Sequence, residues 1–200
     1  MAFAIKRDKT YTFKDYLTWP DDEKWEIVGG MAYNMTPAPT VKHQSIVWKI
    51  CRVIDKNDEK IGDCSAFSAP TDVVLDEYNV VQPDIFVVCD KGKITEENIQ
   101  GAPDLIIEVV SPGTEVKDRR EKKNLYERFG VREYILVFPE REYVERYGLQ
   151  EGKYHGPEIF NWDETMNLTV FEFELNLWEI FEKEKPEELP FLQEDPNGPQ

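Results

Sequence analysis

The sequence predicts an α/β protein in which buried strands are combined with amphipathic helices. Two short apolar runs, 85–89 and 105–110, are rich in β-branched residues and bounded by turn formers, as expected of central strands. Segment 40–56 instead carries its apolar residues at helical spacing. A second helical segment, 115–129, precedes another apolar run at 131–138. We therefore expect helices to pack against a sheet.

The N-terminal part begins with a short helix and a hairpin. Thr12 is predicted to cap a helix over 13–19, which Pro20 ends. Segments 25–28 and 31–34 flank a Gly-Gly pair and are expected to pair as a hairpin.

The later elements follow from turn residues and short β-rich runs. Segment 90–103 is polar and is predicted to be a loop, while Gly130 is predicted to end the 115–129 helix. Residues 1–181 are interpreted as one domain, and the acidic, proline-bearing residues 182–200 as a mobile or loosely docked tail. The other predictions are strands or hairpins at 69–75, 143–149, 153–154 and 168–173, and a helical turn at 177–181.

Composition restricts the partners. With 40 acidic and 24 basic residues the net charge is −16, so any contact with nucleic acid must be local or metal-assisted. The three cysteines form no CxxC pair, and neither a zinc site nor a disulfide is expected. We find neither an N-terminal signal pattern nor an apolar run that would span a membrane, so the expected location is the reducing cytoplasm.

Two acids stand in or beside the central strands. Asp84 immediately precedes one apolar run and Glu108 lies inside the next. Burying a carboxylate is costly unless something compensates its charge, and a divalent cation is a strong compensator. Glu26 lies in an apolar strand of its own. We therefore predict that Asp84, Glu108 and Glu26 converge on one Mg²⁺ or Mn²⁺.

The helix after Glu108 directs one lysine toward these acids. At helical spacing, Asp118 and Lys122 share a face with Leu125, Tyr126 and Phe129. Lys122 is thus predicted to point to the strands and to orient water or phosphate. The basic residues between 117 and 128 form either a phosphate-facing patch or an ordinary solvated face.

The order of these residues resembles the Uma-type restriction endonuclease family of the PD-(D/E)XK superfamily, over about residues 10–180. The resemblance implies a restriction-endonuclease-like core, with a mixed central β-sheet flanked by helices, additional antiparallel hairpins and a magnesium-dependent site at Asp84 and Glu108. The superfamily signature has a lysine two residues after the strand acid, where this chain has Val110, and Lys122 is predicted to replace it. The motifs that carry the resemblance are Trp25-Glu26-Ile27-Val28-x-Gly30, His43, Gln82-Pro83-Asp84, Pro103-Asp104-Leu105-Ile106-Ile107-Glu108-Val109-Val110-Ser111-Pro112, Asp118, Lys122, Tyr126, Gly130-Val131 and Glu133-Tyr134.

Each supporting residue also has a structural reading. Asp118 either holds Lys122 in place or forms a salt bridge with it within the helix. His43 either reaches phosphate or caps a helical turn, and Gln82 either lies near the metal or packs at a strand edge. Tyr126 is expected to face the core with its hydroxyl satisfied.

The predicted function is a metal-dependent endonuclease that hydrolyses phosphodiester bonds in DNA. The alternative is a nuclease fold that has lost activity and serves as a binding or regulatory module. Sugar hydrolysis by two carboxylates is disfavoured because the aromatic residues are dispersed. The sequence does not decide whether the substrate is DNA or RNA. It also leaves the oligomeric state open, and a homo-oligomer is one of the alternatives.

Overall fold

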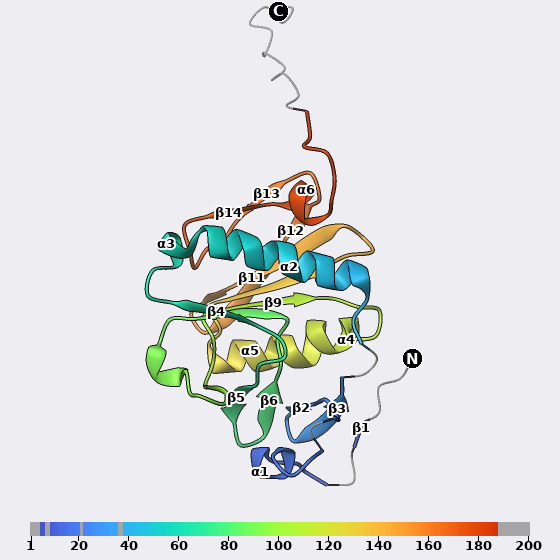
Figure 1. The fold of residues 1–200 in the computed structure, drawn as a ribbon, viewed down its shortest axis with the longest axis vertical. Coiled ribbons are helices and arrows are strands. Elements are labelled where there is room, and N and C mark those ends of the chain that lie inside the picture. Colours follow the sequence, from blue (N-terminus) through green and yellow to red (C-terminus); the bar gives the residue numbers. More distant parts are fainter. Residues whose placement is uncertain (1–4, 7–8, 21, 36–37, 188–200) are drawn as a thin grey trace, which may run out of the picture.

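A computed structural model describes residues 5–6, 9–20, 22–35 and 38–187. Within these residues the strands form two six-stranded sheets and one two-stranded sheet (Figure 1). The N-terminal sheet has the order β1 (Ile5–Lys6), β3 (Met31–Asn34), β2 (Trp25–Val28), β6 (Asn79–Val81), β5 (Val73–Asp76) and β8 (Ile99–Gln100). The central sheet has the order β12 (Lys153–Asn161), β11 (Tyr143–Gln150), β10 (Glu133–Phe138), β9 (Leu105–Val109), β7 (Ile85–Val88) and β4 (Ser65–Ser68).

The central sheet is mixed, as predicted. Strands β9 and β10 are parallel, and the other neighbours in this sheet are antiparallel. A parallel pair requires a crossover, which a continuous helical segment supplies. The segment consists of α4 (Glu115–Lys117), a π-helical turn η2 (Asp118–Lys122) and α5 (Lys123–Phe129). It ends at Gly130, whose φ of 79° is left-handed, as predicted.

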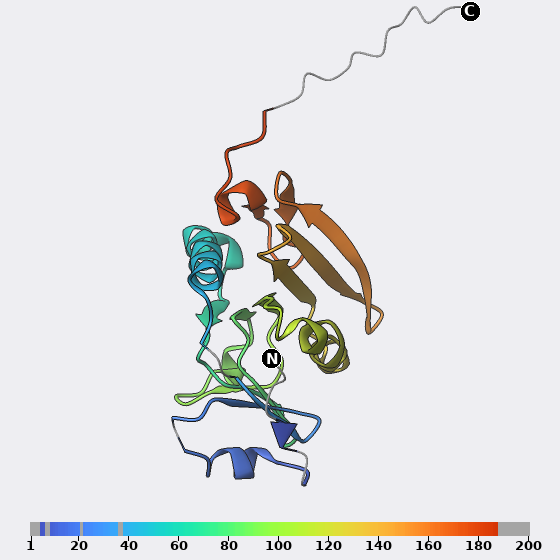
Figure 2. The ribbon, with the colours of Figure 1, turned by 90° about the vertical axis from the view of Figure 1, so that its right-hand side faces the viewer.

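Helices cover both faces of the central sheet (Figure 2). Helix α2 (Val41–Lys56) buries Ile46, Ile50 and Ile54 against one face, together with α6 (Leu177–Ile180). Helix α5 buries Leu125 and Tyr126 in a separate core on the other face. The strands β13 (Thr165–Asn167) and β14 (Glu174–Asn176) pack on the α2 side.

The N-terminal predictions agree closely with the structure. Thr12 caps α1 (Phe13–Tyr16) and forms a capping box with Asp15, although this helix is shorter than expected. Strands β2 and β3 have the predicted bounds, and Thr40 caps α2.

Two segment predictions are wrong, and a third is right only in part. The expected strand at 69–75 begins late: residues 69–72 connect β4 and β5, whereas residues 73–75 belong to β5, because the chain turns at Pro70 before pairing resumes at Val73. The predicted strand at 168–173 is the turn between β13 and β14, and its apolar residues are buried in the α2 core without strand pairing. The predicted loop at 90–103 contains a 3-10 turn, η1 (Lys91–Lys93), and strand β8.

The prediction that the cysteines form no disulfide is also wrong. Cys64 and Cys89 are joined by an S–S bond of 2.08 Å, while Cys51 is free. Strands β4 and β7 are antiparallel, with Ser65 opposite Val88. The next residue on each side is the cysteine, so strand register brings together two thiols that are 25 residues apart.

The described part of the C-terminal segment is docked. Glu182 contacts Ser45 and Lys49 of α2, and the ammonium of Lys183 lies 2.9 Å from the carboxylate of Glu142. Residues 188–200 of the predicted tail lie outside the described residues. Across the described ranges, every helix falls short of the length or apolarity that a bilayer crossing requires.

Candidate active site

The two predicted metal-binding acids lie opposite each other. Strands β7 and β9 are antiparallel, with Ile85 opposite Ile107. Extending this register by one residue places Asp84 opposite Glu108, at the separation of a cross-strand pair. Glu108 shares its strand face with Ile106, which packs in the α5 core. Two acids that are distant in sequence are therefore neighbours at one end of this strand pair.

Asp84 has a structural role that it shares with Asp104, an acid at the other end of the same two strands. The Oδ2 of Asp84 accepts a hydrogen bond of 2.8 Å from the backbone N–H of Val109, the last residue of β9. At the other end of the pair, the Oδ2 of Asp104 accepts an equal bond from the backbone N–H of Cys89. Asp104 faces an apolar residue, Val88, in the extended register, whereas Asp84 faces a second carboxylate. Both acids secure the strands, but Asp104 is paired with the exposed guanidinium of Arg132, at 3.6 Å, whereas several acids gather at the Asp84 end.

Helix α2 adds a histidine to the Asp84 end. The Nε2 of His43 lies 3.2 Å from the Oδ2 of Asp84. Burial alone would lower the pKa of His43, but the Asp84 carboxylate raises it above its ordinary value. The Nδ1 of His43 is buried and has no hydrogen-bond partner within the described part of the chain. His43 therefore supports Asp84 from the opposite side to the lysines.

Lys122 reaches the acids, as the helix pattern predicted. Its Nζ lies 2.7 Å from the Oε1 of Glu108 and 2.8 Å from the Oε1 of Glu26, and its side chain is only 3% exposed. Burial alone would lower the pKa of Lys122, but these carboxylates raise it well above its ordinary value. The hydroxyl of Tyr126 donates a 3.0 Å hydrogen bond to the Oε1 of Glu108. Tyr126 is thus buried with its hydroxyl satisfied, as expected.

Sequence reasoning missed a second lysine, and the prediction that Lys122 alone faces the acids is wrong. The Nζ of Lys117 lies 2.5 Å from the Oε2 of Glu26 and 5.4 Å from the ring centroid of Tyr33. In a regular α-helix, residues five apart point about 140° away from each other. The π-helical turn η2 widens this stretch of helix so that Lys117 and Lys122 share a face. A search for a period of 3.6 residues cannot detect this change.

Glu26 lies between these two ammonium groups. Its side chain is fully buried, and its Oε1 also accepts a 3.0 Å hydrogen bond from the backbone N–H of Gln82. Burial alone would raise the pKa of Glu26, but Lys117 and Lys122 lower it to about 2. Glu26 is therefore firmly ionised, and an ammonium group lies close to each of its oxygens.

The side chain of Gln82 points away from the acids. Its Nε2 donates a 2.7 Å hydrogen bond to the Oδ1 of Asp72 and a 3.3 Å bond to the hydroxyl of Tyr16. This arrangement matches the strand-edge reading of Gln82. Only its backbone contacts Glu26.

Negative charge is in excess around Lys122. Asp118 is buried, and burial raises the pKa of its carboxyl. Burial also raises the pKa of Glu108, to about 8; Lys122 opposes this rise, and Asp118 and Asp84 add to it. The cluster therefore contains four carboxyl groups, two ammonium groups and the imidazole of His43.

The donor set fits a weakly held, hydrated Mg²⁺. Within the described ranges, no three His, Cys, Asp or Glu side chains are grouped as a complete metal cage. Mg²⁺, however, is usually bound through one or two carboxylates and keeps several waters. The contacts above use the Oδ2 of Asp84 and the Oε1 of Glu108, which leaves the other oxygen of each carboxylate available to a cation. The Asp84 side chain is 21% exposed, so solvent reaches this end of the strands.

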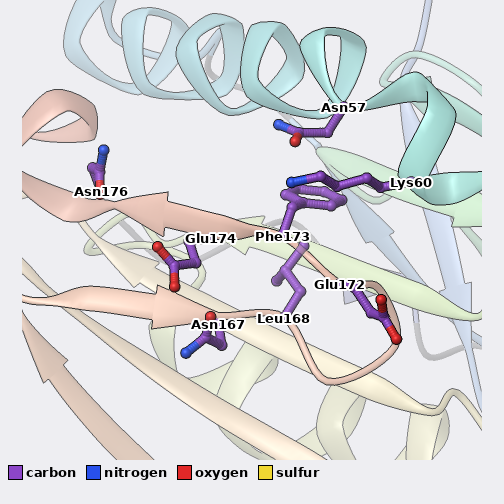
Figure 3. A pocket seen from close by; sticks show the side chains of 8 residues that line it. All are labelled: Asn57, Lys60, Asn167, Leu168, Glu172, Phe173, Glu174 and Asn176. Atoms are coloured by element: carbon purple, nitrogen blue, oxygen red, sulfur yellow. The ribbon is translucent and has the colours of Figure 1, made fainter.

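A hollow of about 470 Å³ lies elsewhere on the molecule, between the C-terminal end of α2 and the β13–β14 turn (Figure 3). It contains none of the predicted site residues. Its lining consists of Asn57, Lys60, Asn167, Leu168, Glu172, Phe173, Glu174 and Asn176.

Comparisons with known proteins show which fold and which family this chain shares. A Synechocystis sp. (strain ATCC 27184 / PCC 6803 / Kazusa) protein, "Uncharacterized protein slr1290", is 29% identical over 128 residues, which are 62% of this chain and 66% of that protein. A crystal structure of "a putative nuclease belonging to DUF820" from Anabaena variabilis ATCC 29413 has the same fold, with a TM-score of 0.70 and 22% identity over 86% of this chain and 97% of that one. Residues 13–178 match the family described as "Uma2: Putative restriction endonuclease". Because this match spans most of its length, the chain belongs to the Uma2 family.

Proposed function

We propose that this protein is a metal-dependent endonuclease that hydrolyses phosphodiester bonds in DNA, with Asp84 and Glu108 as the ligands of Mg²⁺ or Mn²⁺. The observation that carries the proposal is the cross-strand pairing of these two acids beside the ammonium group of Lys122. When bound, the cation would supply an activated water and stabilise charge on the phosphate.

Lys122 would bind and position the reacting phosphate or its water. Its raised pKa keeps the ammonium charged at neutral pH, so it acts as a hydrogen-bond donor and a fixed positive charge. It contacts Glu108 from a helix. In this proposal it replaces the strand lysine of the superfamily signature, at whose position this chain has Val110.

Glu26 is better suited to hold the lysines than to bind the metal. Its two oxygens contact Lys117 and Lys122, and a cation there would be repelled by both ammonium groups. We therefore assign Glu26 and Lys117 to positioning Lys122. His43 would orient Asp84, and Asp118 would add negative charge near Lys122.

A second candidate is a binding module that has kept the fold without the activity. The absence of a lysine at position 110, together with a Glu108 carboxylate already engaged by Lys122 and Tyr126, favours this alternative. The two candidates differ in whether the protein cleaves DNA when metal is supplied.

The test is cleavage of supercoiled plasmid and of single-stranded DNA in Mg²⁺ or Mn²⁺, with and without EDTA. We expect nicking that EDTA abolishes and that Asp84→Asn and Glu108→Gln both remove. Asp104→Asn is the matched control, because it changes an acid with the same backbone hydrogen bond at the other end of the strands. An asparagine oxygen can still accept each bond, so both Asp variants should fold.

Calorimetric titration with Mn²⁺ separates the two candidates further. The nuclease proposal expects binding in wild type and Asp104→Asn, and its loss in Asp84→Asn. A folded protein that binds the cation through Asp84 but cleaves none of the substrates would support the binding module instead. Cleavage that persists in EDTA and in Glu108→Gln would refute the assigned site.

A further inference from the structure

The outward side of α2 presents an exposed tryptophan among basic and hydroxyl side chains. Trp48 is 66% exposed. On a helix, residues three or four positions apart are neighbours. Trp48 therefore neighbours Ser45 and Arg52. Lys49 neighbours the same two residues. We call these four residues the α2 patch. They form one continuous surface along the helix.

The α2 helix is positively charged in an acidic protein. It carries four basic residues and one acid, while the chain has a net charge of −16. The basic cluster predicted at 117–128 is less available, because Lys117 and Lys122 contact buried acids and Arg119 contacts Glu145. Lys42 and Lys49 of α2 are also paired, but with the exposed acids Glu140 and Glu182, which a ligand could displace.

An anionic group already lies on the patch. The Oε1 of Glu182 accepts a 3.0 Å hydrogen bond from the hydroxyl of Ser45 and lies 2.5 Å from the Nζ of Lys49. Glu182 has a φ of 59°, a left-handed conformation that is unfavourable for a residue with a side chain. A hydroxyl and an ammonium one helical turn apart can bind a phosphate oxygen in the same way.

We propose that the α2 patch binds a single nucleic-acid strand, with a phosphate replacing the Glu182 carboxylate on Ser45 and Lys49 and a base stacked on Trp48. An indole ring stacks on a base only when that base is unpaired, and Arg52 lies one turn farther along to meet the backbone. This inference rests on the proposed nuclease function and adds that the substrate approaches the site as an unpaired strand.

The patch lies near the acids along the helix but on another side of it. Helix α2 begins beside the acids, since His43 in its first turn contacts Asp84. Trp48 lies five residues farther, about 7.5 Å along the helix axis and about 140° around it, so a strand bound to the patch would have to pass around the start of α2 to reach Asp84.

The test is fluorescence anisotropy of a labelled single-stranded oligonucleotide in EDTA, where the proposed cleavage is switched off. Base stacking contributes about 1–3 kcal/mol, so Trp48→Ala should weaken binding by about 5- to 150-fold. Lys49→Gln should also weaken binding, and Glu182→Gln should strengthen it by removing the competing carboxylate. Ile159→Ala, which changes another exposed apolar side chain on β12, should have no effect.

Unchanged binding in both Trp48→Ala and Lys49→Gln would overturn the inference, as would an equal loss for the matched duplex. A wild-type dimer that Trp48→Ala converts to a monomer in sedimentation would show that a second copy covers the patch. Failure here is distinct from failure of the proposed nuclease. Trp48-dependent binding in a protein that never cleaves would leave this inference intact, and metal-dependent cleavage without Trp48-dependent binding would refute it alone.

Discussion

Glu26→Gln should be one of the most destabilising conservative changes in this protein. The Glu26 side chain is fully buried between the ammonium groups of Lys117 and Lys122, at 2.5 and 2.8 Å. Glutamine keeps the shape of the side chain but removes its negative charge. Both lysines would then lose the negative charge that they share at Glu26.

The magnitude of this loss follows from the buried ion pairs. Removing one partner of a buried ion pair typically costs about 3–5 kcal/mol. We therefore expect the free energy of unfolding to fall by about 3–5 kcal/mol.

Glu108→Gln provides the contrast, because it changes a buried glutamate that contacts the same lysine. The raised pKa of Glu108 means that its negative charge is disfavoured by burial and by Asp118 and Asp84, so an uncharged glutamine relieves repulsion there. Without divalent metal we expect this variant to lie within about 1 kcal/mol of wild type or to be more stable.

The assay is urea unfolding in EDTA, followed by circular dichroism, with the slope m compared between proteins. Glu127→Gln is a control for removing an acid at the surface, where Glu127 contacts Lys153. Equal stability of Glu26→Gln and wild type at unchanged m would refute the electrostatic reasoning. So would a Glu108→Gln loss as large as that of Glu26→Gln.

Three further outcomes are expected. Mn²⁺ at one hundred times its Kd should raise the unfolding free energy of wild type and Asp104→Asn by about 2.7 kcal/mol. It should leave the unfolding free energy of Asp84→Asn unchanged. An equal rise in all three proteins would place the metal elsewhere. Lys122→Met should abolish plasmid nicking because it removes the ammonium group beside Glu108. Lys117→Met should retain part of the nicking activity. The reverse result would mean that the roles of the two lysines are exchanged. Peptide mapping without reductant should recover Cys64 linked to Cys89, and Cys64→Ser should cost about 3 kcal/mol in urea unfolding under the same conditions, with Cys51→Ser as the control.

The sequence was sufficient where a single periodic pattern governs the structure. Glu108 stands out as an acid within an apolar strand, and Lys122 follows from the 3.6-residue period of its helix. Both side chains lie in the predicted place.

Features that depend on strand register or on a break in period could not be predicted. The Cys64–Cys89 bond requires knowing that β4 pairs with β7 and in which register. Lys117 joins the site only because the helix widens to a π-turn between it and Lys122. The buried apolar run at 168–173 has strand-like composition but packs as a turn, since tertiary burial outweighs local propensity there.

Charge balance connects these features to the proposed metal. Glu26, Asp84, Glu108 and Asp118 bring four carboxyl groups together, while the π-turn supplies two lysines and α2 supplies His43 beside Asp84. Glu26 contacts both ammonium groups and its pKa is lowered, whereas the pKa of Glu108 is raised, so in the cross-strand pair of Asp84 and Glu108 the negative charge of Glu108 is incompletely compensated. A divalent cation has the charge that this pair lacks, and the pair has an oxygen free on each carboxylate and access to solvent at Asp84. Glu26, which holds the two lysines, and the pair of Asp84 and Glu108, which would bind the metal, thus belong to one electrostatic arrangement. This arrangement explains why a lysine on the helix can replace one on the strand.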